Sequence, residues 1–149
     1  MSEINRRDFI AGAVVALGAC ASCPLHAAVE AKKDPVDVGP VVGFAKDGIF
    51  DGWAKTHALF VVRNSGRLYA VSSSCTHKRF ALVSSDGALK CPKHGSIFNT
   101  AGKPTKAPAR KVLPRFGISV NEQGRVIVEP SREFGEKQWE EPGSYVTVK

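Results

Sequence analysis

Apolar and polar positions alternate along most of the chain after residue 32, which is the pattern of strands with one buried face. Residues 58–75, ALFVVRNSGRLYAVSSSC, predict two strands joined by an Asn-Ser-Gly turn. Residues 112–130, VLPRFGISVNEQGRVIVEP, predict a second hairpin with Asn-Glu-Gln-Gly at its tip. We expect a short strand at residues 88–91, and a strand followed by a turn and a loop at residues 97–105. Residues 131–149 predict a short helix or turn around a tryptophan and then an edge strand. The pattern therefore predicts one all-β domain.

Composition supports this prediction. Fourteen glycines and nine prolines in 149 residues favour many turns, and hence short strands over long helices. The length is enough for one domain with a modest core, and no internal repeat is visible.

The formal net charge is +7, and the basic residues are concentrated in one stretch. Between Lys78 and Arg115 there are nine Lys and Arg residues against a single acid, Asp86. Such a stretch forms either an ordinary solvated basic face or a docking surface for an acidic partner. No basic motif interleaved with aromatic residues and no recognition-helix pattern is present, so nucleic acid is not an expected partner.

The N-terminal residues have the three parts of an export signal. Residues 1–8 are polar, residues 9–22 are apolar and small, and small residues suited to a signal peptidase follow. The apolar run is short for a membrane span, and a short N-terminal core helix is the structural alternative. The stretch 5-NRRDFI-10 resembles the twin-arginine signal, which implies export of a protein already folded around its cofactor, and hence a periplasmic location.

Three fates of this leader are open. Cleavage near Ala27 or Ala28 releases a soluble protein; the stretch 17-LGAC-20 looks like a lipoprotein box and would lipidate Cys20; or the leader stays as an anchor. We expect cleavage, which gives a signal peptide at 1–28, a linker at 29–35 and a folded domain at 36–149. Membrane association is expected only if the leader is retained or Cys20 is lipidated.

Two short clusters carry the candidate chemistry: Cys75-x-His77 and Cys91-x-x-His94, with thirteen residues between them. Thiolate is a soft ligand and imidazole a borderline one, so two of each suit zinc, or iron bound together with sulfide. Strand-like residues precede each cluster, which suggests two tip loops that meet over one site. The alternatives are a tetrahedral structural zinc site and a Cys75–Cys91 disulfide beside two idle histidines.

The pair CTH and CPKHGS resembles the Rieske [2Fe–2S] family, whose motif is Cys-x-His followed by Cys-x-x-His on two loops. The resemblance covers residues 36–130. It implies a Rieske-type antiparallel β-sandwich with two cluster-binding tip loops and one [2Fe–2S] cluster per chain. It also implies that Cys75 and Cys91 bind one iron and His77 and His94 bind the other.

The chain departs from the family pattern at informative positions. In cytochrome bc-type members a disulfide ties the two loops, but the corresponding positions here are Phe80 and Lys93. Ser96 matches a serine that donates a hydrogen bond to cluster sulfide in high-potential members, whereas Phe98 replaces a tyrosine that bonds a ligand cysteine there. Hydrogen bonds to sulfur raise the potential, so an intermediate potential is expected.

The resemblance implies a one-electron transfer protein, with the two histidines near the surface as the electron port. It would act as a carrier or as a small subunit of an oxidoreductase rather than as a stand-alone catalyst, with an acidic redox protein as its partner. A catalytic oxygenase subunit needs a second domain with a mononuclear iron site, for which the chain has no room. The alternative of a different class is a non-redox binding module with a structural zinc ion on the same four residues.

Overall fold

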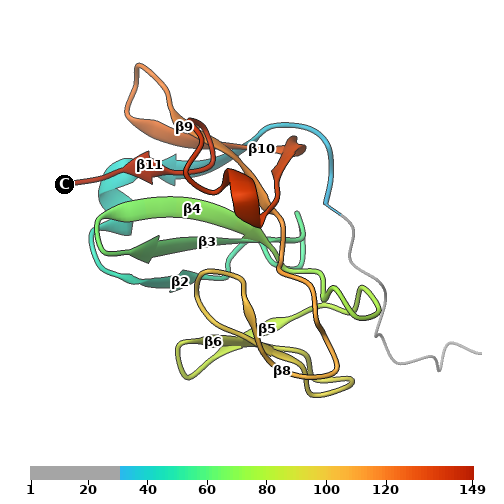
Figure 1. The fold of residues 1–149 in the computed structure, drawn as a ribbon. Coiled ribbons are helices and arrows are strands. Elements are labelled where there is room, and N and C mark those ends of the chain that lie inside the picture. The colour runs from blue at the N-terminus through green and yellow to red at the C-terminus, as the bar shows by residue number, and fades with distance from the viewer. Residues whose placement is uncertain (1–30) are drawn as a thin grey trace, which may run out of the picture.

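The computed structural model describes residues 31–149, so the predicted signal and Cys20 lie outside the described residues. This part of the chain contains two antiparallel sheets and two short 3₁₀ turns, and no α-helix. Figure 1 shows the smaller sheet below the larger one. Over the described residues, no helix has the length and hydrophobicity needed to cross a bilayer. The predicted all-β antiparallel class is confirmed.

The larger sheet has seven strands in the order β1-β10-β9-β4-β3-β2, with β11 paired to the start of β4. Its strands are β1 (Val36–Pro40), β2 (Gly48–Phe50), β3 (Leu59–Asn64), β4 (Arg67–Ser72), β9 (Arg115–Val120), β10 (Arg125–Phe134) and β11 (Val146–Thr147). The smaller sheet contains β5 (Val83–Ser85), β6 (Ala88–Lys90), β7 (Ile97–Phe98) and β8 (Pro104–Lys106), in that order. The 3₁₀ turns are η1 (Val41–Phe44) and η2 (Glu136–Gln138).

Both predicted hairpins are present. β3 and β4 pair around Ser65 and Gly66, which both have positive φ, at 51° and 77°. That geometry is the primed turn whose twist matches the strands that it joins. β9 and β10 pair around a turn in which Gly124 has φ 72°. The expected short helix before an edge strand corresponds to η2 and β11.

The strand β10 is longer than the pattern predicts. It continues past residue 130 to Phe134, and the register with β9 shifts between Glu129 and Glu133. The shift falls at Pro130, which has no N–H to donate to a ladder, and bulges accommodate such residues. The early strands β1 and β2 and the turn η1 were not predicted individually.

The central strands β3 and β4 are buried on both faces. Their alternate residues enter two different apolar clusters. Leu59, Val61, Leu68 and Ala70 pack inside the larger sheet. Phe60, Val62, Tyr69 and Val71 pack toward the smaller sheet, in the cluster that also holds Cys75 and Cys91. The expectation of one buried face is therefore wrong for this hairpin. Its apolar run is nearly continuous, and it joins the general core to the core beneath the predicted site.

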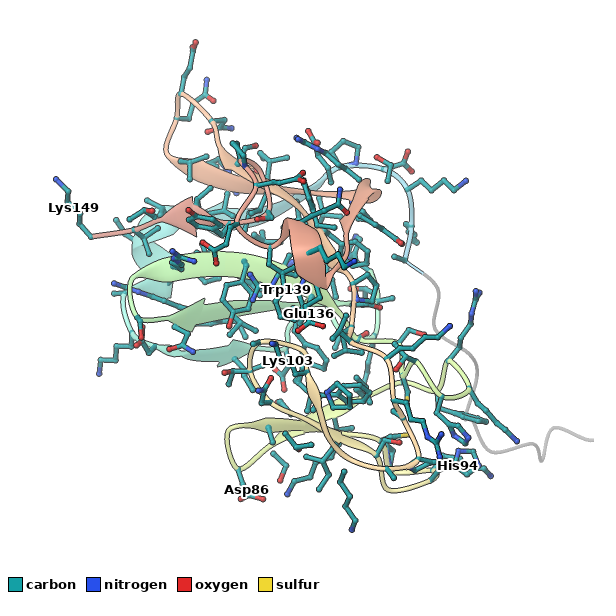
Figure 2. All side chains as sticks on the ribbon, viewed as in Figure 1. Asp86, His94, Lys103, Glu136, Trp139 and Lys149 are labelled. Atoms are coloured by element: carbon teal, nitrogen blue, oxygen red, sulfur yellow. The ribbon has the colours of Figure 1, made fainter. Side chains whose placement is uncertain are left out.

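The C-terminal segment connects the two sheets. Lys103, which lies in the turn before β8, forms an ion pair with Glu136 of η2 at 2.6 Å, and its Nζ lies 5.7 Å from the centroid of the Trp139 ring. Figure 2 shows these three side chains together where the two sheets meet. On the inner side of Trp139, the guanidinium of Arg115 lies between Trp139 and Tyr69, 4.2 Å and 3.9 Å from the ring centroids. This stack holds the smaller sheet against the larger one at the end remote from the labelled His94.

Candidate metal centre

The two predicted ligand loops share one backbone fold. In the first loop, Cys75 N–H donates to Phe80 O at 2.8 Å, and Arg79 N–H donates to Cys75 O at 2.7 Å. In the second, Cys91 N–H donates to Ser96 O at 2.8 Å, and Gly95 N–H donates to Cys91 O at 3.0 Å. Each cysteine thus opens a turn closed by the residues four and five positions later.

The fourth residue after each cysteine has positive φ, 57° for Arg79 and 79° for Gly95. Glycine adopts this conformation without cost, whereas arginine does so with some strain. A Cβ at Gly95 would meet no protein atom within 4 Å, so the backbone conformation is the reason for glycine there.

These turns bring together all four predicted ligands. Cys75 and Cys91 are 1% and 2% exposed, and both are free thiols in this structure rather than partners in a disulfide. His77 is half-buried and His94 is exposed at the tip of the smaller sheet, where Figure 2 labels it. The two imidazole centroids lie 5.0 Å apart with perpendicular ring planes. The site therefore has an inner pair of sulfur atoms and an outer pair of imidazoles.

Electrostatics distinguish the inner and outer pairs. Burial raises the pKa of the Cys75 thiol, although hydrogen bonds from the His77 backbone and the Ser96 side chain oppose the shift. The buried thiol is thus neutral until a metal replaces its proton. Desolvation lowers the pKa of His94, with the nearby positive charges of His77, Lys78 and Lys93 adding to the effect. A lowered pKa keeps this imidazole neutral, which is the form that binds metals.

The donor set fits a binuclear iron–sulfur cluster. The buried Nδ1 of His77 has no hydrogen-bond partner among the described residues, and a buried nitrogen without a partner is costly. Two buried thiols, the available ring nitrogen of His77 and the neutral imidazole of His94 make up the four donors that such a cluster requires. In a binuclear cluster the ligands are divided between two irons, two on each.

A third loop, residues 107–114, covers the inner side of the site. Its Ala109 N–H donates to the Ser96 Oγ at 3.0 Å, and its Lys111 carbonyl accepts a hydrogen bond from Thr76 Oγ1 at 2.7 Å. Ser96 is fully buried. Its hydroxyl accepts from the Ala109 N–H, and its hydrogen bond to the Cys75 thiol opposes the rise that burial causes in the pKa of that group, so Ser96 bridges this loop and the Cys75 sulfur. Sequence reasoning singled out Ser96 but missed this loop, for which two prolines bracketing a non-periodic stretch were the available signal.

Phe80 and Lys93 link the two ligand loops. The Phe80 ring packs edge-on against the His94 ring at 5.5 Å between centroids, and the Lys93 Nζ lies 5.8 Å from the centroid of Phe80. Phe80 also packs against the apolar cluster that contains both cysteines. A ring contact thus joins the loops across the outer side of the site.

The basic stretch is only partly available as a surface. Arg115 is 6% exposed between its two aromatic rings, Lys90 pairs with Asp86 at 2.6 Å, and Lys103 pairs with Glu136. Lys78 and Lys93 are exposed beside His94 and are close enough to affect its pKa. The expectation of a basic face is therefore best met next to the outer imidazoles.

Together, the two sheets, the paired loops and the donor set define a small all-β protein with an iron–sulfur centre at one tip. The model of the Rieske [2Fe-2S] domain matches residues 34–117, which is more than half of the chain. The chain belongs to the Rieske family, and its cofactor is a [2Fe–2S] cluster.

Curated relatives agree with this placement. The chain is 28% identical over 116 residues to the chloroplastic cytochrome b6-f complex iron-sulfur subunit of Fritillaria agrestis, covering 62% of this chain and 50% of that protein. It is 34% identical over 74 residues to the cyanelle cytochrome b6-f complex iron-sulfur subunit 2 of Cyanophora paradoxa, covering 47% and 31%. The chain thus spans half or less of the length of these relatives.

Among solved structures, the chain is similar to the cyanobacterial plasma membrane Rieske protein PetC3 from Synechocystis PCC 6803. The TM-score is 0.51 at 31% identity, and the match covers 62% of this chain and 97% of that one.

Proposed function

We propose that this protein carries single electrons on a Rieske cluster held by Cys75 and Cys91 at one iron and by His77 and His94 at the other. The observation that carries this proposal is the juxtaposition of two buried free thiols with two adjacent imidazoles, one of them with an unpartnered buried Nδ1. When bound, the cluster takes up and releases one electron at a time.

The side chains around the cluster have separate tasks in this proposal. The buried cysteines keep the inner iron away from water, which leaves the outer, histidine-bound side as the face toward a partner. The exposed His94 ring would carry the electron between that face and the partner, and Phe80 packs on the ring and fixes its orientation. Ser96 donates to sulfur and stabilises added negative charge there.

We propose an acidic redox protein as the partner. The exposed Lys78 and Lys93 stand beside His94, so an acidic surface would be guided to the end of the molecule where the electron leaves. Such charges mainly raise the rate of association and make it dependent on salt. The named relatives are subunits of cytochrome b6-f complexes, and this chain serves either as a subunit of a comparable assembly or as a separate carrier.

We also propose export by the twin-arginine route to the periplasm, with residues 1–28 as the signal, 29–35 as the linker and 36–149 as the domain. The residues that support export are Arg6, Arg7 and Phe9 in 5-NRRDFI-10. Export of a folded chain suits a cluster inserted in the cytoplasm. A leader that is retained, or lipidated at Cys20, would place the domain at the membrane, the location given in the name of the similar PetC3 structure.

The test is to purify the exported form, assay iron and acid-labile sulfide, and record an electron paramagnetic resonance spectrum after dithionite reduction. Iron and sulfide in equal amounts, filling one binuclear cluster per chain, with the low-average-g rhombic signal of a histidine-bound cluster, support the proposal. Zinc without sulfide and no signal on reduction would refute it and restore the binding-module alternative.

Variants test the assigned ligands. His94→Ala should abolish the rhombic signal. His57→Ala is the matched control, because His57 lies outside the two motifs. Its Nδ1 is hydrogen-bonded to the hydroxyl of the neighbouring Thr56. Loss of the signal in both variants, or in neither, would contradict the ligand assignment.

A further inference from the structure

An open cleft lies beside the first ligand loop, which contributes Cys75 and Thr76 to its lining. One wall is formed by the loop around Cys75, and the other by the bulged part of β10 around Ser131. The cleft has a volume of about 630 Å³. Pockets that hold small organic molecules have volumes of roughly 300 to 1,000 Å³, so this cleft can hold more than a water cluster.

Among the described residues that line the cleft, basic residues outnumber acidic ones. Lys33 and Lys111 line it with exposed side chains, and Glu133 is the one acidic residue among the described lining positions. Arg79 also lines the cleft, but it has an interaction of its own and is not counted as a partner for the anion. Lys33 comes from the segment before β1 and Lys111 from the loop that covers the site, so the fold gathers the two cations from distant parts of the sequence. Like charges around a concave surface concentrate the positive potential within it.

Hydroxyl groups supply donors for an anionic oxygen on the walls. The Ser72 Oγ accepts a hydrogen bond from Ser74 N–H at 3.1 Å, which leaves the Ser72 hydroxyl proton to donate elsewhere. Ser131 and Thr76 also line the cleft, although Thr76 donates to the Lys111 carbonyl. Cations with hydroxyl donors form a binding surface for carboxylate or phosphate oxygens.

We propose that this cleft binds a small carboxylate or phosphate anion, and that the bound anion lowers the reduction potential of the cluster. The coupling rests on the proposed function, because it requires Cys75 to be a cluster ligand. An anion beside Cys75 opposes the arrival of an electron at the cluster. By reciprocity, reduction weakens anion binding by the same factor. The cleft would thus adjust the potential to the concentration of an anionic metabolite or ion.

The first measurement is isothermal titration calorimetry on the oxidised, cluster-loaded full chain with succinate and with inorganic phosphate, against erythritol as a neutral control. Saturable binding of either anion, and none of erythritol, is expected. Lys33→Gln combined with Lys111→Gln should weaken binding at least tenfold. Lys46→Gln, which removes an exposed charge outside the cleft, should leave the affinity unchanged. Preference for succinate or for phosphate then distinguishes the two sources of anionic oxygen.

The second measurement is the midpoint potential with and without the anion that binds. If the oxidised protein binds that anion ten times more tightly than the reduced protein does, saturation lowers the potential by about 59 mV. Ser131→Glu places a fixed carboxylate in the cleft, so it should lower the potential without added anion and abolish the response to it.

Two outcomes overturn the proposal in separate ways. Heats no larger than those of erythritol overturn the binding site. Binding that leaves the potential unchanged overturns the coupling. Absence of iron and sulfide, by contrast, refutes the proposed function, and calorimetry on the protein still tests the cleft.

Discussion

Replacing Ser96 by alanine tests how the protein sets its potential. The hydroxyl is fully buried, accepts from Ala109 N–H at 3.0 Å and hydrogen-bonds the Cys75 sulfur. A hydrogen bond to a charged group is worth about 1.5–3 kcal/mol, and it strengthens when the sulfur gains negative charge on reduction. If it strengthens by about 1 kcal/mol, removing it lowers the one-electron potential by about 40 mV.

The same substitution also affects folding. Ala109 N–H loses its acceptor in a buried position, which costs about 1–3 kcal/mol of unfolding free energy. Ser144→Ala is the matched control, because Ser144 is equally buried and its hydroxyl bonds the carbonyls of Trp139 and Glu141 at 2.7 Å. It should destabilise the protein comparably and leave the potential unchanged.

The assays are a spectroscopically monitored redox titration and urea unfolding of the cluster-loaded proteins. An unchanged potential in Ser96→Ala, with the cluster retained, would refute the reasoning. An equal shift of the potential in Ser144→Ala would also refute it, because that result would show that a loss of folding stability alone changes the potential.

Four further predictions follow from other contacts. Trp139→Ala should lower the unfolding free energy in urea by about 3–5 kcal/mol, because it removes a large buried ring and exposes the Arg115 cation beneath it. Asp37→Asn should make the loss of stability in acid less steep. The hydrogen bond from Arg125 on β10, together with one from the Gly39 N–H, lowers the pKa of Asp37. The stability that this carboxylate contributes is therefore present above the ordinary carboxyl pKa and is lost as the pH falls through the lowered pKa. Thermal unfolding from pH 7 to pH 2 would reveal this, and equal slopes in both proteins would contradict it. Lys93→Glu should slow electron transfer to an acidic partner and reduce its salt dependence in stopped-flow kinetics; an unchanged salt slope would exclude the proposed face. The wild-type potential should lie between the family extremes, and Phe98→Tyr should raise it, because the buried Phe98 has no hydroxyl to donate to sulfur.

Local sequence signals predicted much of this fold. The two hairpins were predictable because their turn residues and their apolar alternation lie within short windows, as at Ser65 and Gly66. The family and its cofactor were also predictable, because Cys75, His77, Cys91 and His94 form two compact motifs. The features of the structure that local signals did not predict depend on contacts between residues far apart in the sequence. Arg115 counted as one of nine basic residues, yet it is buried between rings that lie 46 and 24 positions away in sequence.

The three loops show how a site of this kind is held without a covalent bridge between them. Cys75 and Cys91 open turns of the same design, and both thiols are free. At the two positions where cytochrome bc-type members have a disulfide, Phe80 and Lys93 make a ring contact instead, and the same ring packs on His94.

On the inner side, Ser96 and Thr76 tie each ligand loop to the loop at 107–114. The ligand loops are thus joined by the ring contacts of Phe80 on the outer side and by hydrogen bonds to a common third loop on the inner side. None of these contacts depends on a cystine, so the three loops are joined without a disulfide between them. Such an arrangement suits the proposed order of events, in which the chain folds around its cluster in a reducing compartment before export.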